Sequence, residues 1–339
     1  MQKIKKNFSL KPYNTFGITV NANYFIEINN TAELISVLKD EQYRSLPKLI
    51  LGGGSNVLFT SDYPGLVIKN SILGIEIIAD DDDSIMLKVG GGEIWHQLVV
   101  YAVGKGYGGI ENLSLIPGTV GAAPMQNIGA YGVEVKDVFV SLEALNKESL
   151  KIEKFRLEDC KFGYRQSVFK NDLKDKYVIT SVTIKLSKHP TLNTSYGAIE
   201  ATLNSEGVLE PTIKEVSDAV IKIRKSKLPD PAEIGNAGSF FKNPTISEID
   251  YEGLKAEFAD IPGYEQPNHE VKVPAGWLIE NCGWKGKTYG EIGVHKNQAL
   301  VLVNYGNGNG FDLKNLAMEI QQSVSKKFGI ELEMEVNVI

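Results

Sequence analysis

The segment Pro47–Phe59 reads PKLILGGGSNVLF, and the interpretation of the whole sequence starts from it. Residues 49–51 form a short apolar run that is typical of a buried strand. Directly after this run come Gly52, Gly53, Gly54, Ser55 and Asn56. Because glycines carry no Cβ, the backbone N–H groups of such a turn can approach an anion closely, and we expect the pyrophosphate of a dinucleotide there.

Two better-known phosphate-binding motifs do not fit this segment. No G-x-G-x-x-G opens a helix and no Lys-Ser/Thr follows the glycines, so the segment is neither a Rossmann fingerprint nor a P-loop. A glycine-rich β-turn that binds nothing explains the segment, taken alone, equally well.

A second glycine-rich segment, Leu115–Gly132, reads LIPGTVGAAPMQNIGAYG and carries almost no charge. Solvated loops normally carry charge, so we expect this backbone to pack closely against something flat and buried. A buried structural loop is the alternative, but two such segments in one chain favour a bound cofactor.

The composition limits the class of protein. At 339 residues the chain is long enough for two or three domains, and its 42% hydrophobic and 23% charged residues are typical of a globular protein. The net charge of −6 argues against general nucleic-acid binding. The two cysteines and four histidines show no disulfide or metal-ligand spacing. Since no signal-peptide core and no membrane-length apolar run occurs, we expect a cytoplasmic protein.

Periodicity predicts a mixture of strands and helices. Strands are expected at residues 24–28, 66–68, 72–78, 85–89, 138–145, 152–155, 177–186, 299–303 and, by strict alternation, 330–338. Helices are expected at 94–105, with Gly106 at the C-cap, and at 275–282. Further helices are expected with Thr31 and Asp312 as their N-caps, and at the capping box of Thr212 and Glu215.

Other polar features have both a structural and a functional interpretation. Asp80–Asp83 fits a solvated hairpin better than a calcium site, because EF-hand spacing is absent. The cations of 224–227 close a predicted helix, where they suit the helix dipole as well as an anionic ligand. His96 fits a surface histidine better than a base. Ser239 lies among small residues but lacks the G-x-S-x-G elbow of serine hydrolases.

Taken in order, these segments resemble the UDP-N-acetylenolpyruvoylglucosamine reductase (UDP-N-acetylmuramate dehydrogenase) family over nearly the whole chain. The resemblance lies in LGGGSNVLF, IPGTVGAAPMQNIGAYG, FGYRQSVFK, KLPDP, GNAGSFFKNP, AGWLIE, HKNQALV and LEMEV. It implies an α+β protein with a vanillyl-alcohol-oxidase-type FAD-binding fold. The implied parts are two FAD-binding α+β subdomains, residues 1–70 (joined by a strand at 329–339) and 71–220, and a substrate-binding domain at 221–328.

The resemblance also implies which residues contact a non-covalently bound FAD. Residues 52–56 match the pyrophosphate contacts. The rest of the cofactor is lined by Ile116, Pro117, Gly118, Thr119, Gly121, Asn127, Gly129, Ala130, Tyr131 and Tyr164.

By the same resemblance, NADPH reduces FAD and leaves, and an enolpyruvyl sugar nucleotide then receives a hydride at its vinyl carbon. Arg165 and Glu335 match the residues that stabilise the enolate-like charge, and preorganised electrostatics are usually the largest catalytic contribution. Ser239 matches the donor of the proton to the α-carbon. The matching substrate contacts are Tyr196, Lys227, Asn243, Tyr264, Lys285 and Gln298.

One departure and two rival interpretations stand beside this resemblance. Asn337 replaces an arginine that many family members have two residues after the catalytic glutamate. An oxidase on the same flavin fold is the nearest rival, although no His or Cys in the motifs suits a covalent flavin anchor. A non-catalytic nucleotide-binding module would leave Ser239, Arg165 and Glu335 unexplained. We expect a monomer whose partners are small molecules, with no metal, nucleic acid or membrane.

Overall fold

The structure is a computed structural model that describes residues 3–339, and these divide into two compact units. Unit 1 comprises the residues up to Phe8, Ala22–Gly53 and Pro64–Ser226. Unit 2 comprises Ser9–Asn21, Gly54–Tyr63 and Lys227–Ile339. The three-part division expected from the family resemblance stays a prediction.

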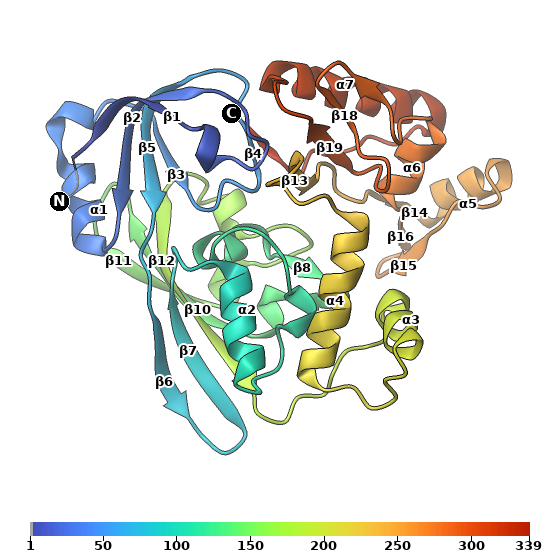
Figure 1. The fold of residues 1–339 in the computed structure, drawn as a ribbon, viewed down its shortest axis with the longest axis horizontal. Coiled ribbons are helices and arrows are strands. Elements are labelled where there is room, and N and C mark those ends of the chain that lie inside the picture. Colours follow the sequence, from blue (N-terminus) through green and yellow to red (C-terminus); the bar gives the residue numbers. More distant parts are fainter. Residues whose placement is uncertain (1–2) are drawn as a thin grey trace. The chain divides into compact units, whose positions relative to one another are not determined.

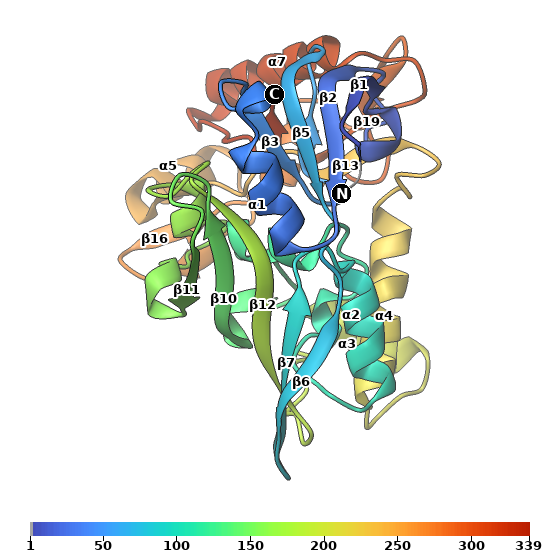
Figure 2. The ribbon, with the colours of Figure 1, turned by 90° about the vertical axis from the view of Figure 1, so that its left-hand side faces the viewer.

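Unit 1 contains two main sheets (Figures 1 and 2). The first has the strand order β1 (Lys5–Ser9), β2 (Asn21–Ile28), β5 (Tyr63–Asn70) and β3 (Lys48–Leu51), with β3 parallel to β5. The second is antiparallel, and its order is β11 (Ile152–Arg156), β10 (Phe139–Asn146), β12 (Tyr177–Ser187), β7 (Ser84–Gly90) and β6 (Ile75–Asp80). Figure 2 shows the twist of this second sheet.

The helices of unit 1 include α1 (Thr31–Lys39), α2 (Trp95–Gly104), α3 (Gly197–Ser205) and α4 (Ile213–Lys227), whose last residue belongs to unit 2. Figures 1 and 2 show α2 and α4 side by side. The buried stripe of α2 consists of Trp95, Leu98, Val99 and Ala102, which share one core with the five-stranded sheet. This spacing of three and four residues is the amphipathic pattern expected of a helix on a sheet.

Unit 2 has its own sheets. The main one has the order β13 (Gly235–Ser239), β19 (Val301–Asn304), β18 (Ile292–Val294) and β17 (Thr288–Tyr289), and α6 (Ala275–Asn281) and α7 (Gly310–Phe328) pack with it. A smaller sheet of β14 (Thr245–Ser247), β16 (Glu270–Lys272) and β15 (Tyr264–Gln266) carries α5 (Glu248–Glu257). Near the C-terminus, β20 (Asn337–Val338) pairs in parallel with β4 (Val57–Leu58).

The predicted elements occur, but several boundaries differ. The N-caps are Asn30 and Asn309, whose side chains accept the backbone N–H of Glu33 and Asp312, so the predictions of Thr31 and Asp312 as caps were wrong. An asparagine directly before the first helical residue satisfies an N–H of the first turn that has no partner within the helix. The C-cap of α2 is Lys105, and Gly106 follows it in the left-handed region.

The strand predicted at 330–338 is regular only at β20, although burial does alternate from Ile330 to Glu333. The strand predicted at 72–78 begins later, at Ile75, and continues to Asp80. Hydrophobic periodicity records which side chains are buried, whereas strand assignment requires a paired neighbour, and this explains the difference at 330–338.

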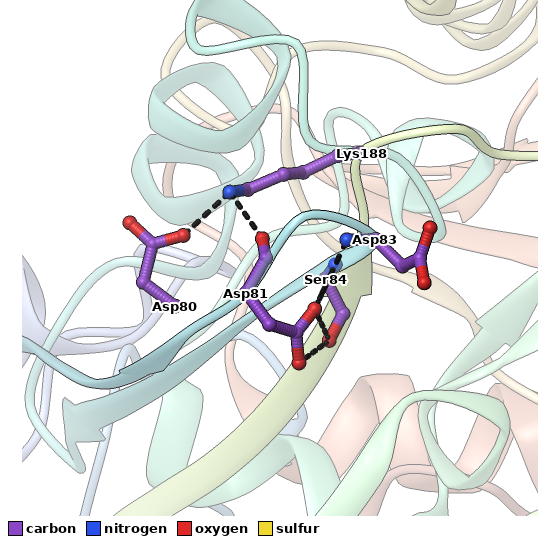
Figure 3. A network of polar contacts seen from close by, with 5 residues as sticks. All are labelled: Asp80, Asp81, Asp83, Ser84 and Lys188. Carbon is purple, nitrogen blue, oxygen red and sulfur yellow. Dashed lines mark hydrogen bonds and ion pairs between the residues drawn. The ribbon is translucent and has the colours of Figure 1, made fainter.

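The acidic turn is a hairpin between β6 and β7, as predicted. The Asp81 carboxylate accepts the N–H groups of Asp83 (3.0 Å) and Ser84 (2.7 Å), while Lys188 donates to Asp80 and to the Asp81 carbonyl (Figure 3). Hydrogen bonds from Ser84 lower the pKa of Asp81. Across residues 3–339, no helix is both long enough and apolar enough to cross a membrane.

Candidate active site

In unit 1 the two glycine-rich segments contact each other directly. A Cβ on Gly52 would lie 2.5 Å from Thr119 Oγ1, and one on Gly53 would lie 2.8 Å from the Cα of Gly118. Both distances are well inside van der Waals contact, so these glycines are required for the two backbones to pack together. The sequence interpretation left a ligand and a purely structural turn both open, but it did not predict that the two segments contact each other.

A cavity of about 140 Å³ in unit 1 is lined by both segments. Its lining includes Gly52, Thr119, Gly121 and Met125, together with the rings of Phe169 and Tyr177. Glycine backbone and apolar rings can accept a flat group, because no Cβ obstructs its approach. Three of the lining residues, Gly52, Thr119 and Gly121, come from the predicted cofactor contacts.

Two lysines that the sequence interpretation missed stand at this cavity. Lys48 and Lys147, with Asp175, line it and also line an adjoining cavity of about 580 Å³. Burial lowers the pKa of both lysines, and Asp175 partly opposes this effect at Lys147. The local excess of positive charge suits an anionic dinucleotide, so the residues present fit FAD. No sequence motif links these two lysines, and only the fold places them together.

Four of the described non-glycine residues with left-handed backbone lie in the predicted site segments, and others, such as Asn7 and Asn268, lie elsewhere. Leu115, Asn127, Tyr131 and Arg165 have φ values of 58°, 44°, 51° and 54°. Non-glycine residues rarely adopt this conformation, and it clusters at functional sites where the surrounding structure enforces it. Three of these four residues are ones for which the family resemblance predicted a role.

Asn127 links the second glycine-rich segment to the segment that carries Arg165. It is fully buried, and its amide donates to Glu134 Oε2 (3.0 Å) and to the Gly163 carbonyl (3.2 Å). Its Oδ1 accepts the N–H of Lys136 (3.0 Å). The side chain therefore holds the site together, and its predicted contact with the cofactor stays a prediction.

Arg165 is held within the same part of unit 1. Its Nη2 donates to the Gly129 carbonyl (2.8 Å), and its guanidinium lies 5.5 Å from the centroid of the Tyr164 ring. Nearby, Ser167 Oγ donates to the Met125 carbonyl (2.7 Å). The structure thus joins the Tyr-Arg pair to the predicted cofactor segment, which the pair alone did not indicate.

Among the other residues predicted to contact FAD, Pro117 is exposed, and half-buried positions are Ile116, Gly118, Ala130 and Tyr164.

A predicted cofactor residue and a predicted substrate residue lie against each other in unit 1. The rings of Tyr131 and Tyr196 are perpendicular, with centroids 5.2 Å apart. Tyr196 remains 49% exposed, so one side of its ring is open to solvent or a ligand.

In unit 2, the residues after the glycines are tied to the C-terminal strand. Asn56 Nδ2 donates to the Glu335 carbonyl (3.2 Å), and both the N–H (3.1 Å) and the Nδ2 (2.9 Å) of Asn337 donate to the Asn56 carbonyl. Gly54 has φ +65°, and a Cβ there would overlap the carbonyl of Tyr13. Asn337, which departs from the family pattern, thus supports the backbone of the predicted pyrophosphate turn.

Ser239 and Glu335 lie on adjacent paired segments of unit 2. Glu335 N–H donates to the Phe240 carbonyl (2.8 Å), and Phe241 and Met334 form an antiparallel bridge. Ser239 ends β13 opposite Val301 of β19. The predicted proton donor and the predicted carboxyl group are therefore close in the fold although they are far apart in sequence.

The remaining predicted substrate residues fall into two groups. Asn243 and Gln298 are close to the Ser239 segment: Asn243 Oδ1 accepts the Ala275 N–H (3.0 Å), and Gln298 Oε1 accepts the Leu300 N–H (3.3 Å), while the Leu300 carbonyl accepts from Phe240 (2.7 Å). The others are on more open surfaces. Lys227 is exposed at the end of α4, Tyr264 is 61% exposed on β15, and Lys285 pairs with Glu280 (2.9 Å).

Comparisons with known proteins agree with this geometry. A family model described as an FAD binding domain matches residues 22–150, and one described as the C-terminal domain of UDP-N-acetylenolpyruvoylglucosamine reductase matches residues 230–339. The curated UDP-N-acetylenolpyruvoylglucosamine reductase of Flavobacterium johnsoniae is 52% identical over 99% of this chain and 100% of its own length. That of Amoebophilus asiaticus is 51% identical over 99% of each chain.

A solved structure shows the same fold. The UDP-N-acetylenolpyruvylglucosamine reductase of Thermus caldophilus superposes with a TM-score of 0.68 at 24% identity, covering 100% of this chain and 99% of that one. The predictions of an α+β FAD-binding fold and of FAD as the cofactor are confirmed.

Proposed function

Because the chain belongs to the UDP-N-acetylenolpyruvoylglucosamine reductase family, we propose that it reduces the enolpyruvyl double bond of a UDP-N-acetylglucosamine ether to UDP-N-acetylmuramate, with NADPH as the electron donor. The structural observation that supports this most directly is the hydrogen bonding between the segment that follows Ser239 and the segment that carries Glu335. This backbone contact supports the proposal, because an acid-assisted reduction needs a hydroxyl and a carboxyl group in one site.

The chemistry that FAD supplies when bound is hydride transfer, first from NADPH and then to the vinyl carbon. Residues 52–56, the segment from Ile116 to Tyr131, and the two cavity lysines, Lys48 and Lys147, would hold it. The lysines would face its phosphates, since an ammonium group is a compact partner for a phosphate oxygen.

Arg165 would bind the substrate carboxylate. Hydride addition at the vinyl carbon builds enolate-like charge on that carboxylate, so a fixed cation there stabilises the transition state more than the ground state. The bond to Gly129 and the contact with the Tyr164 ring orient the guanidinium before the substrate arrives. Such a cation needs no reorganisation at the moment of reaction.

Ser239 would donate its hydroxyl proton to the α-carbon. A serine hydroxyl is a weak acid, but the intermediate is a strong base, so the transfer is feasible when the geometry is right. Glu335, in its protonated form, would donate a hydrogen bond to the same carboxylate. Lys227 would bind the diphosphate of the sugar nucleotide.

Anaerobic spectroscopy tests this proposal. The yellow protein should bleach with NADPH and recover its oxidised spectrum only when the enolpyruvyl sugar nucleotide is added. A flavin that is reoxidised by air but not by this substrate would favour an oxidase on the same fold. A protein that cannot be reconstituted with FAD would contradict the assignment altogether.

The proposal includes a cytoplasmic monomer, which suits soluble nucleotide substrates. Light scattering on the FAD-loaded protein should give the mass of a single 37.3 kDa chain. A stable dimer mass at micromolar concentration would contradict it.

A further inference from the structure

A histidine outside the predicted site holds the start of the second glycine-rich segment. His96, on α2, accepts the backbone N–H of Leu115 at its Nδ1 (3.0 Å). Leu115 has φ +58°, a conformation that a residue with a branched side chain adopts only when its surroundings enforce it. His96 is half-buried, so it is less exposed than a free surface histidine.

The carbonyl of Leu115 is also held by a hydrogen bond. The Leu115 carbonyl accepts from Arg224 Nε (3.3 Å), in the last turn of α4. A cation near the C-terminus of α4 suits the helix dipole, but Arg224 also bonds to the Leu115 segment elsewhere in unit 1. His96 and Arg224 together fix both backbone groups of Leu115.

Arg224 also interacts with the side chain of Tyr131. Burial raises the pKa of the Tyr131 hydroxyl, and the charge of the adjacent Arg224 opposes that rise. The Tyr131 backbone is fixed separately, because its carbonyl accepts from Asn112 Nδ2 (3.0 Å). The ring of Tyr131 then forms the surface against which Tyr196 packs.

We propose that His96 is a positioning residue for substrate binding: by holding Leu115 it fixes Arg224, and through Arg224 the Tyr131 ring that supports Tyr196. This inference rests on the proposed function, in which Tyr196 contacts the sugar nucleotide. His96 itself touches none of the reacting groups.

The hydrogen bond between Leu115 and His96 requires a neutral imidazole, since a protonated Nδ1 cannot accept the Leu115 N–H. Burial lowers the pKa of His96, and the cations of α4, Arg224 and Lys225, lower it further. The carboxylate preceding α2, Glu93, accepts the Gly74 N–H (2.7 Å). Protonation therefore becomes significant only below the ordinary histidine range near pH 6.5. Substrate affinity should be complete above that range and fall as the pH drops through the lowered pKa.

Two substitutions separate positioning from bulk packing. His96→Asn retains an acceptor near the place of Nδ1 but cannot titrate, whereas His96→Leu keeps volume and loses the acceptor. Leaving a half-buried donor unpaired should raise the KM for the enolpyruvyl sugar nucleotide by about tenfold in His96→Leu. With FAD added to saturation, flavin reduction at saturating NADPH should stay unchanged. His189→Leu, at an exposed histidine, is the matched control.

The pH profile of kcat/KM for the sugar nucleotide gives the decisive readout. The wild type should lose kcat/KM below about pH 6.5, and this acid limb should be absent from His96→Asn, which does not titrate there. An unchanged acid limb in His96→Asn, or an unchanged KM in His96→Leu, would overturn the inference while leaving the proposed function standing. A wild type that is never reoxidised by the sugar nucleotide would instead refute the proposed function and this inference with it.

Discussion

The side-chain amide of Asn56 donates a hydrogen bond to the backbone carbonyl of Glu335, 3.2 Å away. Asn56 belongs to the turn that was expected to bind pyrophosphate, and Glu335 to the strand that was expected to carry a catalytic carboxyl group. One amide therefore links two segments that are far apart in sequence and for which different roles are predicted. Asn337 closes the contact by donating twice to the Asn56 carbonyl.

Asn56→Ala should lower both stability and the rate of substrate reduction. Removing the donor leaves the Glu335 carbonyl without this partner, which typically costs about 1–3 kcal/mol. Asn337→Ala should cost less, because its backbone N–H still donates to Asn56. Urea unfolding and single-turnover flavin reoxidation would check both changes. Equal losses in the two variants would mean that the side chain of Asn56 has no special role.

Ser239→Ala should separate the two half-reactions. Flavin reduction by NADPH should remain nearly intact, while reoxidation by the sugar nucleotide should slow by about 10²–10⁴-fold, the usual contribution of a positioned acid. Stopped-flow absorbance would measure each half-reaction. Ser247→Ala, which removes the N-cap of α5, is the control and should leave reoxidation unchanged. Equal slowing of both half-reactions by Ser239→Ala would show that Ser239 shapes the site without donating a proton.

Lys147→Ala should weaken FAD binding. Loss of one phosphate-facing cation should raise the FAD dissociation constant by about tenfold, which is the order expected for one charge-assisted hydrogen bond. The defect should shrink in high salt, since screening reduces the contribution of the wild-type lysine. Fluorescence titration of the apoprotein would check it. Lys151→Ala, at an exposed lysine outside the cavity lining, is the control, and an identical affinity in both variants would contradict the assignment.

Gly52→Ala and Gly53→Ala should both destabilise unit 1, but only the first should be rescued. The new Cβ at position 52 meets the Thr119 side chain, so Thr119→Ala in the same chain should recover most of the loss of about 1–3 kcal/mol typical of overpacking. The Cβ at position 53 meets the backbone of Gly118, which no side-chain substitution removes. Thermal unfolding of the two single variants and the double variant would check this. Rescue failing at position 52 would show that the glycines serve only the ligand.

Local sequence was sufficient for many individual elements. The stripe of α2 and the capping box of α4 depend on residues three and four apart, so they could be predicted from spacing. The N-caps Asn30 and Asn309 were not predicted, because several neighbouring polar residues could cap each helix equally well. The family resemblance supplied the fold class and the cofactor, and the comparisons confirm them.

The sequence by itself determined the glycine-rich backbone, the family and the candidate residues, because these depend on residue type and order along the chain. Only the tertiary structure decided that Lys48 and Lys147 line one cavity and that Asn56 bonds to Glu335. It also decided that His96 and Arg224 both bond to the backbone of Leu115. Each of these contacts joins residues from separate elements. No local pattern encodes such a pair, since its partners meet only when long-range packing has closed the chain between them.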